Sequence, residues 1–204
     1  MKIKNIIFDF GGVLIDWDPR YLYESVFPDK AEMEIFLKNI CSPAWNLKQD
    51  AGYPLSAATK ELQTRYPMYH DAIEMFYKDW IRMVRGEIIE NTSLLKPLKI
   101  KYRLFGLSNW SAETFPLVYD RYSFFSDFEG IVISGQEKML KPDKGIYELL
   151  LNRYGLKANE SLFIDDSINN IITAKEMGLS TIHLDGNASL KEQLLKYRAI
   201  RSSS

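Results

Sequence analysis

The sequence of 204 residues has little cysteine and little histidine, and these shortages exclude several kinds of chemistry. Cys41 is the sole cysteine, so the chain can form neither an intrachain disulfide nor a cysteine-based zinc site. His70 and His183 are the two histidines, and both lie far from Cys41 in the sequence, which disfavours a thiol–imidazole pair. We interpret Cys41 as a packing residue and the histidines as structural or surface residues. Catalytic groups are therefore expected among the carboxylates, hydroxyls and lysines.

Excess charge of one sign and long apolar runs are also missing. The 26 Lys and Arg residues nearly balance the 27 Asp and Glu residues, so no basic surface for nucleic acid or anionic membrane is expected. No stretch approaches the roughly 18 uninterrupted apolar residues of a membrane span, and the N-terminus lacks the pattern of a signal peptide. These features predict a cytoplasmic protein that binds neither nucleic acid nor membrane, and they leave its oligomeric state open.

The chain is organised around its first strand and the turn after it. The apolar run Ile6-Ile7-Phe8 predicts a buried strand, which leads into Asp9 and then into the glycine pair Gly11-Gly12. In an open α/β sheet, ligands bind at the carboxyl ends of the strands, where Asp9 is expected to lie. At this point four roles fit Asp9: nucleophile, metal ligand, base, or N-cap of the next helix.

From about residue 99 onward, predicted strands alternate with predicted helices. The expected strands cover 102–107, 130–134, 161–164 and 181–184, and the expected helices cover 112–119, 144–154, 168–177 and 190–201. Repeated strand–helix–strand units predict a parallel sheet with helices on both faces. Residues 201–204 are predicted to be a frayed tail.

The segment from Asp18 to Leu95 differs, because its apolar residues recur at helical spacing and strand-like alternation is scarce. Breaks at Pro28, Ser42-Pro43, Gly52-Tyr53-Pro54 and Pro67 predict a bundle of about four helices. The fold class is therefore α/β, with a helical bundle inserted after the first strand. We predict an α/β core domain of residues 1–17 and 96–204 and a helical cap domain of residues 18–95.

Polar residues recur at the ends of the other predicted strands. Ser108-Asn109 follows one strand, and Asp165-Asp166 follows another. Carboxylates of Asp9, Asp165 and Asp166 at one edge of a sheet would repel one another unless a cation lay among them. Because all three offer oxygen, the expected cation is Mg²⁺.

The remaining polar residues suit a phosphoryl group. Ser108, Asn109 and Lys141 supply hydrogen-bond donors and a positive charge, which would stabilise the phosphoryl oxygens in a transition state. Among nearby lysines, Lys141 is favoured by its position just before Pro142. As a carboxylate nucleophile, Asp9 would then form an aspartyl-phosphate that water hydrolyses.

These residues carry a resemblance to the haloacid dehalogenase-like hydrolase superfamily. Its four motifs resemble, in order, Phe8-Asp9-Phe10-Gly11-Gly12-Val13-Leu14, Leu107-Ser108-Asn109, Lys141-Pro142 and Phe163-Ile164-Asp165-Asp166-Ser167. The resemblance implies a Rossmann-like core with a helical cap, Asp9 as nucleophile, and Ser108 and Lys141 on the phosphate. It implies Mg²⁺ held by Asp9, Asp166 and the carbonyl oxygen of Gly11, with Asp165 as an outer partner of a metal-bound water or of Lys141.

One position departs from the family pattern. Most phosphatases of this superfamily carry an aspartate two residues after the nucleophile as the general acid, and this chain has Gly11 there. The subgroup that it resembles most, which includes bacterial α-glucose-1-phosphate phosphatases, also lacks this aspartate. Either the leaving group needs less protonation, or another residue or water supplies the proton. Asp16 and Asp18 are candidates, although Asp18 also suits an N-cap before Pro19.

The resemblance predicts a Mg²⁺-dependent phosphatase of a small phosphorylated metabolite, with a sugar phosphate as the favoured substrate class. The first alternative is a 2-haloacid dehalogenase using the same aspartate without metal; dehalogenases of the superfamily lack the acidic pair and carry a tyrosine at the position of Gly11. The second is a catalytically weak regulatory or binding protein. Several residues of the predicted cap are candidates for substrate contact: Arg20, Tyr21, Trp45, Asn46 and Lys48.

Overall fold

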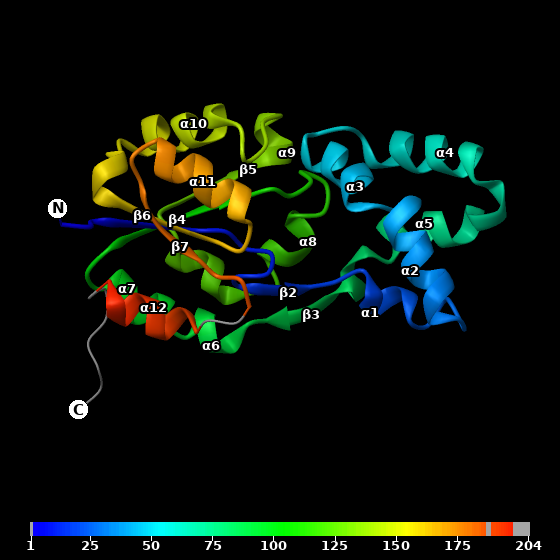
Figure 1. Cartoon of the computed structure of the whole chain (residues 1–204), viewed down its shortest axis with the longest axis horizontal. Coiled ribbons are helices and arrows are strands. Elements are labelled where there is room, and N and C mark those ends of the chain that lie inside the picture. The colour runs from blue at the N-terminus through cyan, green and yellow to red at the C-terminus, as the bar shows by residue number, and fades with distance from the viewer. Residues whose placement is uncertain (1, 187–188, 198–204) are drawn as a thin grey trace.

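A five-stranded parallel sheet lies at the centre of the computed structural model, which describes residues 2–186 and 189–197 (Figure 1). In spatial order, its strands are β5 (Gly130–Ile133), β4 (Arg103–Ser108), β1 (Asn5–Phe8), β6 (Ser161–Asp165) and β7 (Ser180–His183). All four neighbouring pairs are parallel, so the predicted parallel sheet is confirmed. The strand order reverses beside β1, and such a reversal opens a crevice at the carboxyl ends of the strands.

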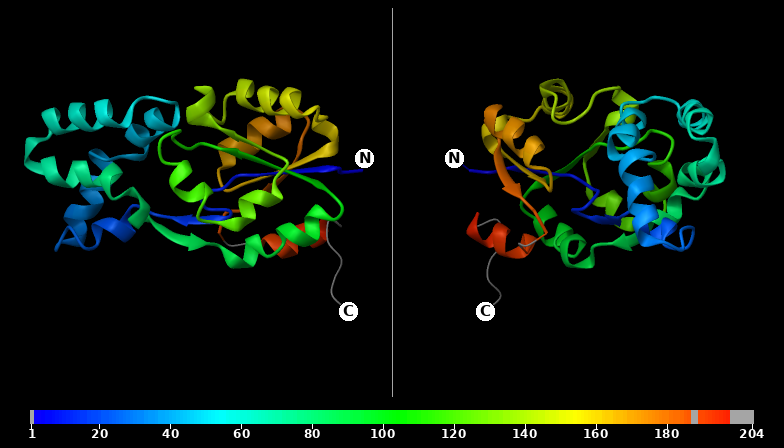
Figure 2. Two further views of the ribbon diagram at one scale, coloured as in Figure 1. Left: turned by 180° about the vertical axis from the view of Figure 1, so that it is seen from behind. Right: turned by 45° about the vertical axis from the view of Figure 1, so that its right-hand side comes forward.

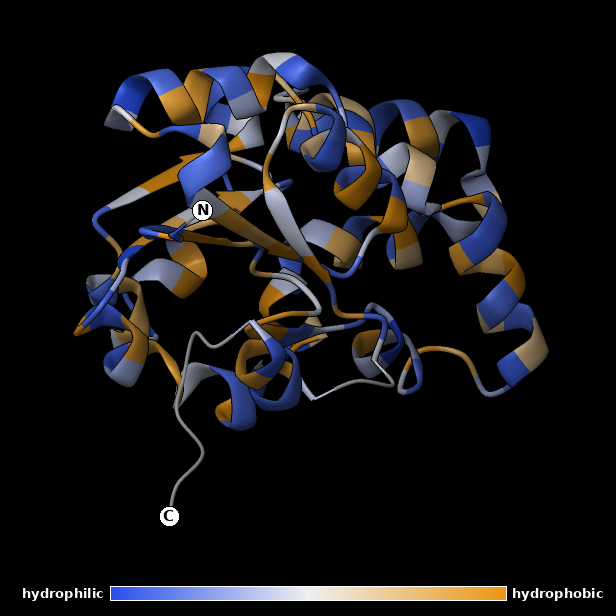
Figure 3. Ribbon diagram, turned by 60° about the vertical axis from the view of Figure 1, so that its left-hand side comes forward, coloured by the Kyte–Doolittle hydropathy of each residue, from blue (hydrophilic) through white to orange (hydrophobic). Residues whose placement is uncertain are grey.

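Both faces of the sheet are apolar, because successive side chains of a strand point to opposite faces. Ile7 packs in the cluster under α10 (Lys144–Tyr154) and α11 (Ile168–Glu176), whereas Ile6 and Phe8 belong to the cluster on the other face. Within the α/β part of the chain, this second cluster includes residues of α7 (Leu95–Lys99), α8 (Pro116–Tyr119), η3 (Ser123–Asp127) and α12 (Leu190–Lys196), and it continues into the inserted helices. Figure 3 shows the central strands largely in hydrophobic colours.

The inserted segment is helical and projects from one end of the sheet, as both views of Figure 2 show. Its helices are α1 (Arg20–Tyr23), α2 (Lys30–Asn39), α3 (Pro43–Asp50), α4 (Leu55–Arg65), η1 (Pro67–Tyr69), α5 (His70–Lys78) and η2 (Trp80–Met83). The predicted breaks coincide with caps: the Ser42 side chain accepts a hydrogen bond from the Trp45 backbone N–H, and Pro43 takes the first helical position. Cys41 is buried in the apolar cluster, in agreement with a packing role.

Two short strands in this region were missed by the sequence analysis. β2 (Ile15–Trp17) and β3 (Val84–Glu87) pair antiparallel where the chain enters and leaves the helical segment. The division into a core of residues 1–17 and 96–204 and a cap of residues 18–95 stays a prediction. The pairing of β2 with β3 supports it, because a paired entry and exit lets the inserted helices move as a unit.

Other helix predictions need correction. The expected helix 112–119 is only α8, because Ser111 Oγ accepts a hydrogen bond from the Glu113 backbone N–H and so stabilises a turn, and Pro116 begins the helix. The expected helix 190–201 is α12, which ends at Lys196, and residues 198–204, with the predicted frayed tail, lie outside the described residues. Five further short helices are not predicted from the sequence: α6 (Ile89–Thr92), α7, α9 (Ser134–Glu137), η3 and η4 (Ala158–Glu160). Among the described residues, no helix has both the length and the apolar character needed to cross a bilayer.

Candidate functional site

Three predicted site residues come together because three adjacent parallel strands end at one edge of the sheet. Asp9 directly follows β1, Ser108 is the last residue of β4, and Asp165 is the last residue of β6. The strands β4 and β6 flank β1, and Phe8 lies opposite both Gly106 and Ile164. The register therefore places Asp9 level with Asp165, and Ser108 lies one residue further along β4.

Lys141 lies at the centre of this group and is fully buried. Its ammonium nitrogen is 2.8 Å from Asp9 Oδ2 and 2.7 Å from Asp165 Oδ2, and it donates a third hydrogen bond of 2.8 Å to the Leu107 carbonyl. A lysine ammonium has three donors, and all three are used. Burial alone would lower the pKa of Lys141, but the charges of Asp165 and Asp9 outweigh burial and raise it. Lys141 is therefore a fixed positive charge.

The Asp9 carboxylate is held at both oxygens. Oδ1 accepts hydrogen bonds from Ser108 Oγ at 2.6 Å and from the Phe10 backbone N–H at 2.7 Å, while Oδ2 faces Lys141. Burial raises the pKa of Asp9 to about 7, although Lys141 acts in the opposite direction. A buried carboxylate fixed in this way has a defined orientation and a strong affinity for a further cation.

Asp165 is inaccessible to solvent, and both of its oxygens are engaged. Besides the ion pair with Lys141, Oδ1 accepts a hydrogen bond of 2.8 Å from the Ser167 backbone N–H. The Asn170 side chain donates to Oδ1 at 2.9 Å and to Oδ2 at 3.1 Å. Of the two outer roles implied for Asp165, these contacts match the one in which it orients Lys141.

Both polar atoms of the Asn109 side-chain amide form hydrogen bonds with the backbone of Lys141. Its Nδ2 donates to the Lys141 carbonyl at 2.9 Å, and its Oδ1 accepts from the Lys141 backbone N–H at 2.8 Å. These bonds fix the loop that carries Lys141 against the end of β4. A direct contact of Asn109 with substrate stays a prediction, and its observed contacts position the lysine.

The same strand ends offer a place for a cation. Oxygens of Asp9, Asp165 and Asp166 lie within 4.8 Å of one another, and Asp166 is exposed. Three carboxylates beside the single ammonium of Lys141 leave an excess of negative charge, which a divalent ion with oxygen ligands would neutralise. The donor set therefore fits Mg²⁺, with the Gly11 carbonyl as a predicted further ligand.

Gly12 lets the Asp166 carboxylate approach the turn after β1. A Cβ on Gly12 would lie 2.5 Å from Asp166 Oδ2, and the backbone φ of +69° also disfavours any other residue. Gly12→Ala is expected to displace Asp166 and to raise the Mg²⁺ concentration needed for half-maximal activity by about tenfold or more, because one carboxylate ligand would be misplaced. A Mg²⁺ titration of the rate measures this.

Gly155→Ala is the matched control, because Gly155 has a φ of +63° and no atom within 4 Å of the added Cβ. It introduces similar backbone strain, on the order of 1–3 kcal/mol, without touching the site. Equal Mg²⁺ requirements of the two variants would contradict a role of Gly12 in admitting Asp166.

Two neighbouring cavities lie near the site: the smaller is between the helical segment and the strand ends, and the larger is lined by residues of the helical segment and its entry. The smaller has a volume of about 90 Å³, and its lining includes Gly11, Asn109, Trp17 and Asp50. The larger, of about 740 Å³, shares Trp17 and Asp50 with it. Of the cap candidates, Asn46 lines both cavities, and Arg20 lines the larger one.

A family model for haloacid dehalogenase-like hydrolases matches residues 3–178, most of the chain. The chain belongs to this family. The predicted family and the predicted enzyme class, a haloacid dehalogenase-like hydrolase, are therefore confirmed, as is the α/β fold with a central parallel sheet.

The haloacid dehalogenase-like relatives include two named phosphatases. A sesquiterpene phosphatase of Aspergillus oryzae is 26% identical over 182 residues, which cover 89% of each chain. A D-ribitol-5-phosphate phosphatase of Bacteroides thetaiotaomicron is 24% identical over 213 residues, covering 94% of this chain and 97% of the relative. The crystal structure of a family enzyme from Bacteroides thetaiotaomicron, in complex with magnesium and inorganic phosphate, matches with 25% identity and a TM-score of 0.71, covering 94% of this chain and 98% of the other.

In this haloacid dehalogenase-like chain, several residues around the site were not singled out from the sequence. Asn170 is the first of these, and the structure shows it as a brace of Asp165. His183 Nε2 lies 2.9 Å from the Asp166 carbonyl oxygen, so this histidine borders the acidic pair. The contribution of Asp50 and Trp17 to the cavities had no signal in the local sequence, since it depends on how helices pack.

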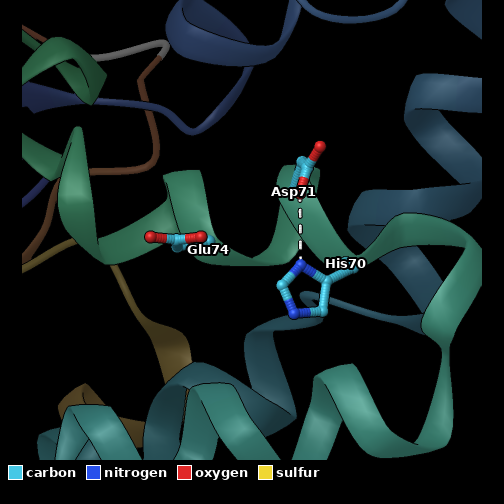
Figure 4. A group of neighbouring side chains, drawn as sticks. All are labelled: His70, Asp71 and Glu74. Carbon is cyan, nitrogen blue, oxygen red and sulfur yellow. Dashed lines mark hydrogen bonds and ion pairs between the residues drawn. The ribbon is translucent and has the colours of Figure 1, made fainter.

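A second group of potential metal ligands lies on α5, far from the strand ends in the fold. Oxygen or nitrogen atoms of His70, Asp71 and Glu74 lie within 4.8 Å of one another (Figure 4). All three residues are exposed, and the His70 ring contacts Asp71 at 3.1 Å. Exposed acidic groups of this kind are ordinary on a helix surface. These residues therefore serve below as sites for control substitutions.

Proposed function

We propose that the protein is a Mg²⁺-dependent phosphatase that hydrolyses a small phosphorylated metabolite through an aspartyl-phosphate on Asp9. The observation that carries the proposal is the buried group of Asp9, Lys141 and Asp165. It holds a carboxylate beside a fixed positive charge at the carboxyl edge of the sheet. The phosphatase names of two relatives that align along most of the chain support the same reaction.

In the proposed reaction, Asp9 attacks the phosphorus atom and later releases phosphate when water attacks the aspartyl-phosphate. Ser108 Oγ and the Lys141 ammonium lie on the two sides of the Asp9 carboxylate, and on substrate binding they would exchange their bonds to Asp9 for bonds to the phosphoryl oxygens. Bound Mg²⁺, held by Asp9, Asp166 and the Gly11 carbonyl, would neutralise phosphoryl charge. Asp165 would hold Lys141 in place, which makes it a positioning residue.

The favoured substrate class is a sugar or polyol phosphate, in line with the ribitol phosphate named for one relative. The sesquiterpene phosphatase adds a second class, phosphates of apolar alcohols. The small cavity has both polar and aromatic lining, including Asn46, Tyr77 and Trp80, so it offers contacts suited to part of either kind of group. Rates of phosphate release from both substrate classes therefore decide which class the protein prefers.

An assay of phosphate release, with and without Mg²⁺, tests the proposed function. Its substrates are sugar phosphates, polyol phosphates, prenyl phosphates, acetyl phosphate and p-nitrophenyl phosphate. We expect release that requires Mg²⁺ and that is lost in Asp9→Asn but retained in Asp71→Asn, which makes the same chemical change on an exposed residue. Release of halide from a 2-haloacid without metal, or no release of phosphate from any of these substrates, would contradict the proposal.

A further inference from the structure

Breaking the bond between phosphorus and an alcohol oxygen leaves an alkoxide unless that oxygen receives a proton. Neither polar neighbour of Asp9 suits this task. The Lys141 ammonium is buried with all three donors in use, and Ser108 donates its proton to Asp9. The proton must therefore come from a group on the side of the site that the leaving group occupies, where the helical segment covers the strand ends.

Asp50 is a carboxyl group in that position. It is the last residue of α3, and two contacts attach it to the α/β core. Its backbone carbonyl accepts a hydrogen bond of 2.5 Å from Ser134 Oγ, and its side chain accepts one from the Ser111 backbone N–H. Ser111 follows Ser108 by three residues, so this bond places the Asp50 carboxyl over the loop that carries a phosphate-binding hydroxyl.

The cavity beside Asp50 extends to residues that neighbour the nucleophile in the chain. Gly11 and Asn109 line the smaller cavity together with Asp50, and they flank Asp9 and Ser108 in the chain. The charge of Asp9 also acts on Asp50, since it contributes to the raised pKa of that group. Space for a leaving group therefore exists between Asp50 and the residues around Asp9.

The protonation state suits a proton donor at neutral pH. Burial raises the pKa of Asp50 to about 7. The charge of Asp9 also raises this pKa, whereas the hydrogen bond from the Ser111 backbone N–H lowers it. Asn46 Nδ2 holds the carboxyl with a hydrogen bond of 3.0 Å. Other charged and titratable groups lie in the region of Asp50. They belong to the elements packed against it and to the lining of the larger cavity: Asp9, Tyr77, Glu113, Asp18, Arg20, Glu34 and Lys38.

The two aspartates predicted from the sequence are less suited. Asp16 accepts a hydrogen bond of 2.7 Å from the Tyr21 hydroxyl, and its strand position in β2 directs it away from the lining of the smaller cavity. Asp18 accepts from the Arg20 backbone N–H at 2.8 Å and forms an ion pair with the Arg20 guanidinium. Asp18 thus acts as a helix cap, which was the simpler of its two predicted roles.

We propose that Asp50 donates the proton to the leaving-group oxygen when Asp9 attacks. The bond between Asp9 and phosphorus forms, the bond to the substrate oxygen breaks, and that oxygen leaves as an alcohol with the Asp50 proton. In the second step, water attacks phosphorus, its proton returns to the Asp50 carboxylate, and the bond between Asp9 and phosphorus breaks. Both carboxyl groups regain their starting states. This inference rests on the proposed function.

Substrates with different leaving groups distinguish a proton donor from a residue with a structural role, because only a poor leaving group needs the proton. We compare Asp50→Asn with the unaltered protein on D-ribitol 5-phosphate, whose leaving group is an alcohol, and on acetyl phosphate, whose leaving group is a carboxylate. We expect kcat/KM to fall by about 100-fold or more with the alcohol and by far less with acetyl phosphate. The unaltered protein should lose kcat/KM for the alcohol phosphate above about pH 7, and Asp50→Asn should lack this loss.

Equal losses on both substrates, or no loss on either, would overturn the assignment of Asp50 and leave the proposed function intact. Retained turnover of acetyl phosphate by Asp9→Asn would instead overturn the proposed function itself. If Asp50→Asn is unfolded, Asp50→Glu replaces it, because it retains the acid but displaces it. It should also lose more activity on the alcohol phosphate than on acetyl phosphate, and equal losses would again reject the role.

Discussion

Replacing Asp9 with asparagine is expected to abolish phosphate release from every substrate. An amide has nearly the shape of a carboxylate, so hydrogen bonds from Ser108 and the Phe10 backbone N–H to Oδ1 can be kept. The neutral amide is too weak a nucleophile to form an acyl phosphate, however, and the covalent route would be closed. Loss of a covalent nucleophile typically costs on the order of 10⁴-fold or more in kcat.

A coupled phosphate assay measures this loss, and circular dichroism checks that the variant is folded. Asp71→Asn is the matched control, because the Asp71 side chain is almost fully exposed and lies outside the site. It should retain the rate of the unaltered protein. A rate for Asp9→Asn within about tenfold of the unaltered protein would mean that Asp9 binds or orients other groups and is not the nucleophile.

Lys141→Met is expected to lower stability and to abolish activity together. Methionine has a similar length but no charge, so Asp9 and Asp165 would remain buried without the ammonium that now lies within 2.8 Å of both. Removing one partner of a buried ion pair typically costs about 3–5 kcal/mol. For a chain of this size, each kcal/mol lowers the melting temperature by roughly 2–4 °C, so a clear decrease is expected.

The loss of stability should depend on pH, and its sign follows from Asp9. Burial already raises the pKa of Asp9 to about 7, and loss of the positive charge would raise it further. A folded-state pKa above that of the unfolded chain favours the folded protein as pH falls. The difference in melting temperature between Lys141→Met and the unaltered protein should therefore shrink as pH falls toward about 7, the pKa of Asp9 in the unaltered protein, and change little below it.

Lys144→Met is the control for this experiment. Lys144, the first residue of α10, follows Lys141 by three residues, but its side chain is largely exposed and forms a surface ion pair with Glu176. Surface pairs of this kind contribute about 0–1 kcal/mol, so its melting temperature should change little. If Lys141→Met were as stable as Lys144→Met at pH 8, the buried charge cluster would not have the importance assigned to it.

The site at the strand ends could be predicted because it depends on local order. A buried strand followed by Asp9, and another followed by Asp165-Asp166, fix polar residues at one edge of any parallel sheet. Lys141 could be predicted from its place before Pro142, although nothing in the local sequence indicates that its ammonium lies between two carboxylates. That detail depends on Asn109, whose amide holds the Lys141 backbone across 32 residues.

The features that escaped prediction depend on contacts between distant segments. β2 and β3 have three and four residues, and their pairing joins the two ends of a long helical insertion. Asp50 sits at the end of an ordinary amphipathic helix, and its place at the site is set by Ser134, 84 residues away. Local periodicity carries no information on such packing.

The most direct test of the account is to trap the aspartyl-phosphate. Turnover of acetyl phosphate with Mg²⁺ would be quenched in acid, and the peptide that contains Asp9 would be analysed by mass spectrometry. The account predicts the added mass of one phosphoryl group on Asp9, absent from Asp9→Asn. A protein that turns over substrate with no phosphorylated peptide, or with the phosphoryl group on Ser108, would contradict Asp9 as the nucleophile.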